Sequence, residues 1–290
     1  MSVLSAEQRH AGRAGRSRRE PSKAPYYVLL CILGFFTLSP MVILLFNSLK
    51  TNVEIGANPI GIPTHPHFDN YLTAFLQGDY GDALRNSTIL ALGTMIGVCL
   101  VAGMAAYAMC RMDLPGGSAV FTYLVAGTTI PAQLYLIPLY FLWSNLNLLD
   151  NLLGLIIIYI ALFSPFQTLL LRSFMLSIPR EFDDAARLDG ANEFQIFLRV
   201  ILPMIWPGLL TVALLSGLSA WNEFLFAILF MQTPSNYPVS IALTNFQQGF
   251  SRQWGLTDAA AVITILPIIL IFLVLQRRFI SGLTAGGLGK

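Results

Sequence analysis

Six long runs of apolar residues with almost no charge dominate this chain of 290 residues. A helix that crosses the hydrocarbon core of a membrane needs about 20 such residues. Because backbone polar groups find no water there, each run must form a helix to satisfy them. We therefore expect six membrane-spanning helices and an all-α polytopic membrane protein, with spans at residues 26–49, 86–110, 118–143, 152–171, 204–230 and 259–276.

The composition excludes a soluble protein. Only 11% of the residues are charged and 55% are hydrophobic, whereas soluble domains contain about 25% charged residues. The three cysteines (Cys31, Cys99 and Cys110) fall within expected spans, so we predict no disulfide. His65 and His67 have metal-ligand spacing but lack Cys, Asp or Glu at a matching distance, so we predict no metal site.

The distribution of Lys and Arg predicts the orientation, since cytoplasmic loops of membrane proteins are enriched in both. With a cytoplasmic N-terminus, only Lys50, Arg85 and Arg252 of the 17 basic residues lie outside. We expect a basic cytoplasmic tail (1–25), a transmembrane domain (26–276) and a cytoplasmic C-terminal tail (277–290). A cleaved signal peptide is the competing interpretation of the start. The first run is longer than the roughly 7–15 apolar residues of such a peptide, so we interpret it as a retained helix.

Two spans carry features that affect packing. Gly93 and Gly97 form a G-x-x-x-G pattern in the second span, which favours close approach of another helix. The third span contains Pro131 and Pro138, which interrupt helical hydrogen bonding. A broken helix often lines a transport pathway, and a simple packed kink is the alternative.

Residues 172–203 leave the membrane between spans four and five, and 177–203 predict a hairpin of two short helices on the cytoplasmic side. Acidic residues occupy the opening turns of the first helix, where the helix dipole favours them. Gly190 is expected to end it in a left-handed turn. Phe182, Ala185 and Ala186 share one face, and Asp189 is a candidate N-cap of the second helix. Phe194, Phe197, Leu198 and Ile201 line one side of that second helix.

The balance of acidic and basic residues indicates whether this hairpin contacts lipid or protein. A helix that rests on anionic lipid is rich in Lys and Arg, but here the acids outnumber the bases. The acidic residues are Glu181, Asp183, Asp184, Asp189 and Glu193. The hairpin is therefore predicted to contact a protein.

The stretch from Asp184 to Ala191, followed by Phe197 and Pro203, resembles the E-A-A-x-x-x-G loop of the permeases of binding-protein-dependent ABC importers. Asp184 stands where that family usually has Glu, which keeps the charge but shortens its reach. Further motifs are similar to the carbohydrate-uptake branch, which includes the smaller permease of the maltose transporter. These are residues 131–133, 137–140, 221–224 and 282–287.

This resemblance implies a prokaryotic inner-membrane complex embedded in the lipid bilayer. Its other members would be a second homologous permease, two copies of a cytosolic ABC ATPase and an extracytoplasmic solute-binding protein, with no nucleic acid. The chain contains no G-x-x-x-x-G-K-[ST] phosphate-binding motif. We therefore expect no enzyme activity and no cofactor in this chain, with ATP bound by the partner ATPase.

The resemblance also implies that the hairpin couples the permease to the ATPase. The residues expected at this contact are Glu181, Asp184, Ala185, Ala186, Asp189, Gly190 and Ala191. In the family the C-terminal tail reaches toward the same interface. The Gly-rich residues 282–289 either contribute to that interface or form a frayed chain end with no role in it.

A second group of residues is a candidate translocation path: Gln133, Tyr135, Trp221, Asn222 and Glu223. Glu223 is the one acid within the expected spans, and a carboxylate in hydrocarbon requires water or a hydrogen-bonding partner. It either lines the pathway or makes a structural hydrogen bond near a kink expected at Gly217 to Ala220. The aromatic ring of Trp221 would suit stacking on a sugar.

Three rival functions differ in what they require of the sequence. A membrane-embedded enzyme would need catalytic groups at helix depth, which the spans lack. An ion-coupled secondary transporter could use Glu223 as a proton site, but the sequence has no detectable internal repeat. A permease for polyamines or another small solute is the remaining alternative. The sequence does not identify the solute, nor whether this subunit contacts it.

Overall fold

The computed structural model describes residues 24–246 and 253–287, and the regular elements in these ranges are helices. The chain divides into two compact units between Ile43 and Leu44, within the first helix α1 (Ala24–Asn47). Within the described residues, four helices are long and apolar enough to cross a membrane, and two bent pairs raise the number to six. The predicted all-α polytopic fold is confirmed.

A short connection follows α1 before the second long helix. It contains α2 (Asn52–Ala57) and α3 (Asp69–Gln77). Lys50 at its start is buried, and its ammonium group donates to Asn47 Oδ1 at 3.0 Å and to the Asn58 carbonyl at 2.9 Å. The chain then enters α4 (Tyr80–Arg111), which begins six residues before the expected span.

The helices α4, α7 (Leu152–Leu176) and α11 (Trp206–Asn222) form the centre of the second unit. Gly93 and Gly97 of α4 face Ile156 and Ile160 of α7. A Cβ added at Gly93 would lie 2.7 Å from Ile156 Cδ1, and one at Gly97 would clash with Ile160. The G-x-x-x-G pattern therefore brings α4 and α7 together, as predicted.

The third span is broken at Pro131. The helix α5 (Gly117–Thr129) ends there, and a 3-10 turn, η2 (Ala132–Tyr135), leads into α6 (Leu136–Asn145) at a bend of 92°. Pro138 lies in the first turn of α6, where helical N–H groups have no intrahelical partner and its missing N–H costs little. The expected interruption is confirmed, and Pro131 marks it.

The fifth span, expected at 204–230 with a kink at Gly217 to Ala220, is divided differently in the structure. The helix α9 (Glu193–Ile196), the π-helical turn η3 (Phe197–Ile201) and α10 (Leu202–Met204) lead to a bend of 83° into α11. The helix then breaks at Glu223 and Phe224, before α12 (Leu225–Phe230). No kink occurs at Gly217 to Ala220, because α11 continues through them to Asn222.

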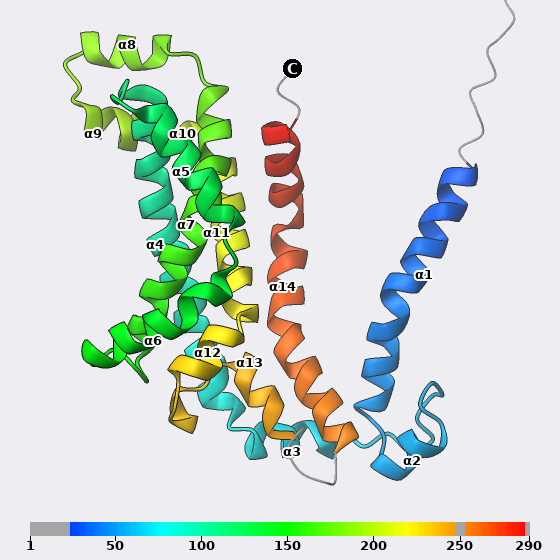
Figure 1. The fold of residues 1–290 in the computed structure, drawn as a ribbon. Helices are drawn as coiled ribbons and strands as arrows, with labels where there is room; N and C mark the ends of the chain where they lie inside the picture. Colours follow the sequence, from blue (N-terminus) through cyan, green and yellow to red (C-terminus); the bar gives the residue numbers. More distant parts are fainter. Residues whose placement is uncertain (1–23, 247–252, 288–290) are drawn as a thin grey trace, which may run out of the picture. The chain divides into compact units, whose positions relative to one another are not determined.

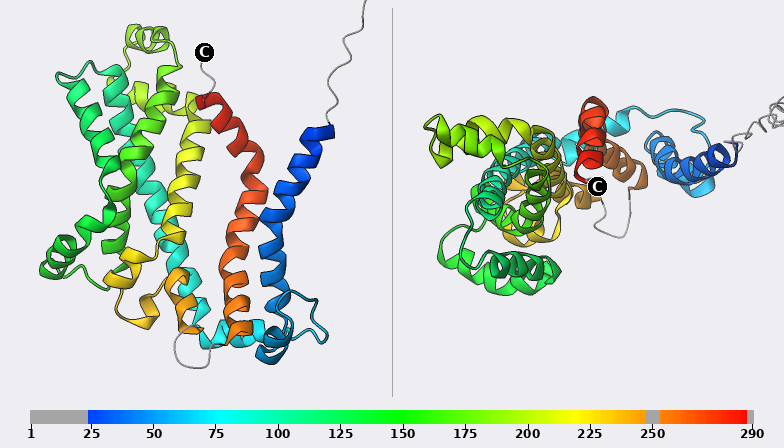
Figure 2. Two further views of the ribbon diagram at one scale, coloured as in Figure 1. Left: turned by 45° about the vertical axis from the view of Figure 1, so that its right-hand side comes forward. Right: turned by 90° about the horizontal axis from the view of Figure 1, so that it is seen from above.

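The remaining elements of the second unit follow α12 in the chain. A 3-10 turn η4 (Pro234–Asn236), α13 (Val239–Ala242) and η5 (Leu243–Phe246) precede α14 (Trp254–Gly287). The helix α14 continues past residue 276 through most of the expected tail. In Figures 1 and 2, the last turns of α14 lie at the same end of this unit as the 177–203 hairpin, and α3 and α13 lie at the opposite end.

Candidate functional site

The hairpin contains two short helices, as predicted: α8 (Glu181–Leu188) and the α9 turn. Gly190 has φ +84°, the left-handed conformation expected for it. Its N–H donates to the Arg187 carbonyl at 3.0 Å, and the Ala191 N–H donates to the Ala186 carbonyl at 3.0 Å. This pair of bonds is the Schellman motif, which ends a helix at a residue that tolerates positive φ.

The start of the second short helix corrects one prediction. Asn192, not Asp189, caps α9. The Asn192 side chain accepts from the Gln195 N–H at 2.9 Å, and the Gln195 side chain accepts from the Asn192 N–H at 3.0 Å. Asp189 instead occupies the exposed C-cap of α8. A residue directly before a left-handed turn belongs to the helix that is ending, so Asp189 lies too early to reach α9.

The outer surface of α8 carries most residues expected at the ATPase contact. Phe182 and Ala185 are exposed, and Leu188 is 90% exposed. Ala186 and Ala191 are half-buried and pack against the core between α4, α7 and η3. The predicted face of Phe182, Ala185 and Ala186 is thus divided. The exposed members of the predicted contact set are Glu181, Asp184, Ala185, Asp189 and Gly190.

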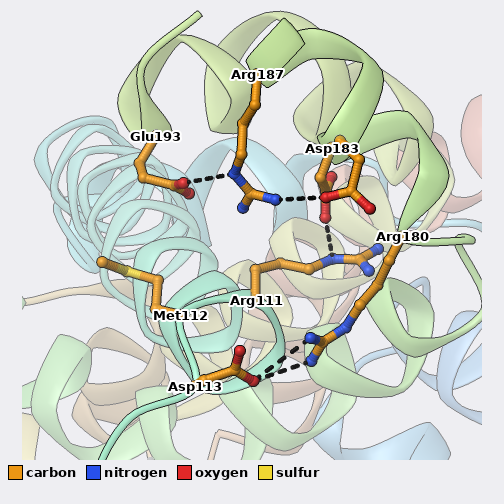
Figure 3. Close-up of a pocket in the computed structure, with 8 residues that line it drawn as sticks. Arg111, Met112, Asp113, Arg180, Asp183, Arg187 and Glu193 are labelled. Carbon is orange, nitrogen blue, oxygen red and sulfur yellow. Dashed lines mark hydrogen bonds and ion pairs between the residues drawn. The ribbon is translucent and has the colours of Figure 1, made fainter.

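A buried ion pair connects α8 to the end of α4 (Figure 3). Arg111 Nε lies 3.1 Å from Asp183 Oδ2, and the two side chains are 4% and 2% exposed. Burial raises the pKa of Asp183, while the charge of Arg111 opposes that rise. The terminal Nη2 of Arg111 also donates to the carbonyl of Met175 in the last turn of α7 at 3.1 Å and to that of Ile178, just after α7, at 2.9 Å.

An exposed network continues from this pair. Arg187 donates to Asp184 Oδ1 at 2.9 Å and to Glu193 Oε1 at 3.0 Å. The Tyr107 hydroxyl of α4 donates to Glu193 Oε2 at 2.7 Å. Together these charged groups surround a pocket of about 470 Å³ between α8, α9 and the end of α4. The acid that replaces the family's usual Glu, Asp184, is therefore already held by a basic residue of its own hairpin.

Away from the hairpin, Glu223 lies at the break between α11 and α12 and caps the start of α12. Its carboxylate accepts hydrogen bonds from the N–H groups of Leu225, Phe226 and Ala227 at 2.9 to 3.1 Å. The Tyr159 hydroxyl of α7 also donates to it at 2.9 Å. These N–H groups begin α12 and have no intrahelical partner, so the carboxylate satisfies them. The geometry favours the structural interpretation of Glu223 over pathway lining.

The other candidate path residues lie in different surroundings. Trp221 is buried, and its indole N–H donates to the Thr264 carbonyl of α14 at 3.3 Å, so its ring is not free to stack on a sugar. Asn222 is exposed and donates to the Leu218 carbonyl at 2.8 Å. Gln133 and Tyr135 are exposed in η2. The turn η2 packs, through Ala132, against the cluster that contains Tyr159 and Phe226.

A polar clamp at this end was not predicted. Asp150, which has φ +54°, joins the α6–α7 loop to the segment after α12. Its carboxylate accepts from the N–H groups of Gln232 and Thr233 at 2.9 and 3.0 Å and from the Thr233 hydroxyl. Burial would raise the pKa of Asp150, but these hydrogen bonds and one from Asn236 outweigh it and lower the pKa.

Sequence reasoning missed the roles of Arg111 and Asp183. In the sequence, Arg111 is one of the basic residues expected on the cytoplasmic side, and Asp183 is one of the five acids of the hairpin. One signal in the sequence indicates this role. Asp183 lies three residues before Ala186, so both side chains share one face of the helix. A carboxylate on a face that packs against the core requires a charged partner. Within the described residues, no three His, Cys, Asp or Glu side chains gather that could hold a metal ion.

The fold defines a class: a polytopic, all-helical membrane protein with a two-helix hairpin at one end of its bundle. The comparisons with known proteins identify it further. Residues 100–284 match the family described as the binding-protein-dependent transport system inner membrane component. The chain belongs to this family. It is a multi-pass inner-membrane permease subunit of an ABC importer, and its ATP is hydrolysed by a partner subunit.

Several curated relatives cover nearly the whole chain. It is 31% identical to a diacetylchitobiose uptake system permease of Streptomyces coelicolor, over 99% of both chains. It is 35% identical to a sulfoquinovosyl glycerol transport system permease of Agrobacterium fabrum, over 90% of both. An arabinooligosaccharides transport system permease of Bacillus subtilis is 31% identical, over 93% of this chain and 98% of its own.

The fold also has a solved counterpart. A crystal structure of a bacterial ABC transporter involved in alginate import contains a chain with a TM-score of 0.77 and 23% identity. The match covers 88% of this chain and 95% of that one. At this identity the likeness shows the fold alone, and it agrees with the helical arrangement described above.

Proposed function

We propose that this chain forms half of the translocation pathway for a sugar or sugar derivative. The observation that carries the proposal is its identity of 31% to 35% with three permeases named for carbohydrate uptake, over at least 90% of this chain. The three named solutes differ in size and charge, so the proposal is limited to the carbohydrate class. The complex would contain a second homologous permease, two ATPase subunits and an extracytoplasmic solute-binding protein.

The 177–203 hairpin is proposed as the contact to the ATPase. Its support is the exposed surface of α8, where the apolar side chains of Phe182 and Leu188 lie beside acidic ones. An exposed apolar surface rimmed by charge is typical of a protein-binding site. The small side chain of Ala185 permits close approach of a partner. In this role the hairpin transmits motion and does not touch the solute.

ATP-driven uptake in proteoliposomes tests the proposed solute class. The complete complex with its binding protein is expected to import one of diacetylchitobiose, an arabino-oligosaccharide or sulfoquinovosyl glycerol. Uptake should require ATP and persist when a protonophore collapses the proton gradient, because Glu223 is occupied as a helix cap. Spermidine serves as the control solute. Uptake of spermidine alone, or uptake that needs the gradient but no ATP, would contradict the proposal.

The orientation is a separate prediction, based on the basic residues. We expect residue 188 in α8 to lie in the cytoplasm and residue 60, between α2 and α3, to lie outside; both native side chains are well exposed. An impermeant thiol reagent added to intact cells should label Ile60→Cys and not Leu188→Cys, and permeabilised cells should show labelling of both. The opposite pattern in intact cells would reverse the topology.

A further inference from the structure

Arg111 joins three segments that are far apart in the sequence. It ends α4, and its Nε faces Asp183 of α8. Its Nη2 donates to the Met175 carbonyl in the last turn of α7 and to the Ile178 carbonyl just after it. Helix ends leave carbonyls without intrahelical partners, and a cation there is favourable. One guanidinium group therefore fixes the end of α7 and the start of α8 to the end of α4.

Burial separates this contact from the other ion pairs of the same region. The side chains of Arg111 and Asp183 are 4% and 2% exposed, whereas those of Arg180 and Asp113 are 58% and 80% exposed. Exposed pairs contribute little because water and salt screen them. Removing one member of a buried pair leaves an uncompensated charge, which is strongly unfavourable. Among these ion pairs, the buried one is therefore the pair whose loss should affect the hairpin most.

The chemistry of Arg111 matters beyond its charge. A guanidinium group presents donors in a rigid plane and can meet a carboxylate and carbonyls at the same time. A lysine ammonium group offers one compact charge at the end of a flexible chain. The apolar residues Cys110, Met175 and Ile178 cover one side of the pair in a buried cluster, and the charged residues of the pocket lie on its other side. Loss of the two hydrogen bonds from Arg111 Nη2 would leave further buried polar groups unsatisfied, beside Asp183 Oδ1, which already has no hydrogen-bond partner.

We infer that Arg111 is a positioning residue that makes α8 move as one body with the adjoining ends of α4 and α7. A displacement applied to the exposed surface of α8 then reaches both long helices and is not absorbed by the linker at 177–180. The inference rests on the proposed function only in assuming that the ATPase supplies this displacement. Asp183 is its partner in the same role, and Asp113 is not.

Distance measurements between spin labels test the inference in the complete complex. Labels at Met104→Cys in α4 and Leu188→Cys in α8 occupy exposed positions, in a background where the exposed Cys31 is replaced by serine. Because Leu188 lies on the proposed ATPase contact, the labelled complex is first shown to retain its ATPase subunits and their activity. We compare the nucleotide-free complex with the complex trapped by ATP and vanadate. In the otherwise native chain the distance should stay constant within about 2 Å, the scale of small helix shifts. In Asp183→Asn, the distance between the labels should change by more than this between the two states, or its distribution should become broader.

Two controls keep the result interpretable. Asp113→Asn removes the same charge from an exposed pair and should leave the distance fixed. If Asp183→Asn also leaves it fixed, the inference is wrong. The double variant Arg111→Met, Asp183→Leu replaces the pair by apolar groups and should recover the yield of complex but not the fixed distance. Recovery of both would overturn the inference, since packing alone would then hold the hairpin. Neither readout involves the solute, so this failure would leave the proposed substrate class intact.

Discussion

Replacement of Gly190 by valine is expected to uncouple ATP hydrolysis from uptake. Gly190 has φ +84° and no atom within 4 Å of where a Cβ would lie, so backbone strain is the reason for the effect. A β-branched residue in this conformation costs about 1–3 kcal/mol. The strain would displace α8 relative to α9. In reconstituted complexes, Gly190→Val should lower both the stimulation of ATPase activity by solute-loaded binding protein and the uptake.

Two further variants separate strain from contact. Gly190→Asn is the matched control, because asparagine tolerates the left-handed region, and it should remain close to the native protein. Ala185→Trp leaves the turn intact but adds bulk to the exposed surface of α8, so it should also uncouple transport or release the ATPase. Native coupling in both Gly190→Val and Ala185→Trp would show that the hairpin is not the coupling element.

Removal of the Glu223 carboxylate is expected to reduce the amount of assembled complex sharply. In Glu223→Ala, three backbone N–H groups of α12 and the Tyr159 hydroxyl lose their acceptor. Leaving buried donors unsatisfied costs about 1–3 kcal/mol for each group. The yield of complex after purification in detergent, and its thermal unfolding temperature, measure this loss.

Glu223→Gln distinguishes the two interpretations of this residue. Glutamine keeps one acceptor oxygen but turns an amino group toward backbone donors, so a cap predicts an intermediate yield and native uptake per assembled complex. A pathway residue predicts the reverse, with native yield and lost uptake. If both Glu223→Gln and Glu223→Ala assemble and transport normally, neither role is correct.

Hydrophobic patterning predicted the spans well because long apolar runs have few alternatives in a membrane. Individual residues also predicted local structure correctly where few residue types fit. These are Gly190 in a left-handed turn, Pro131 at a helix break, and Gly93 and Gly97 at a close helix contact. Each of these depends on the backbone of its own segment, or on the absence of a side chain, and is therefore readable in one sequence.

Polar partnerships were harder to predict. The break in the fifth span lies at Glu223 and not at Gly217 to Ala220, because a carboxylate that reaches forward can cap a new helix within an apolar run. The pairing of Arg111 with Asp183 depends on how α4, α7 and the hairpin pack, at a separation of many residues. Single-sequence reasoning gave the charge of each side chain but not its neighbours.

The clamp at Asp150 has a consequence for the conditions under which the importer works. In the proposed orientation, Asp150 lies on the extracytoplasmic side, where the pH follows that of the surrounding medium. Because its pKa is lowered, the carboxylate stays ionised in a medium acidic enough to protonate an ordinary aspartate, and its contribution is lost only as the pH falls through the lowered value. The outer loops that it joins should therefore keep their arrangement when a microbe acidifies its own habitat.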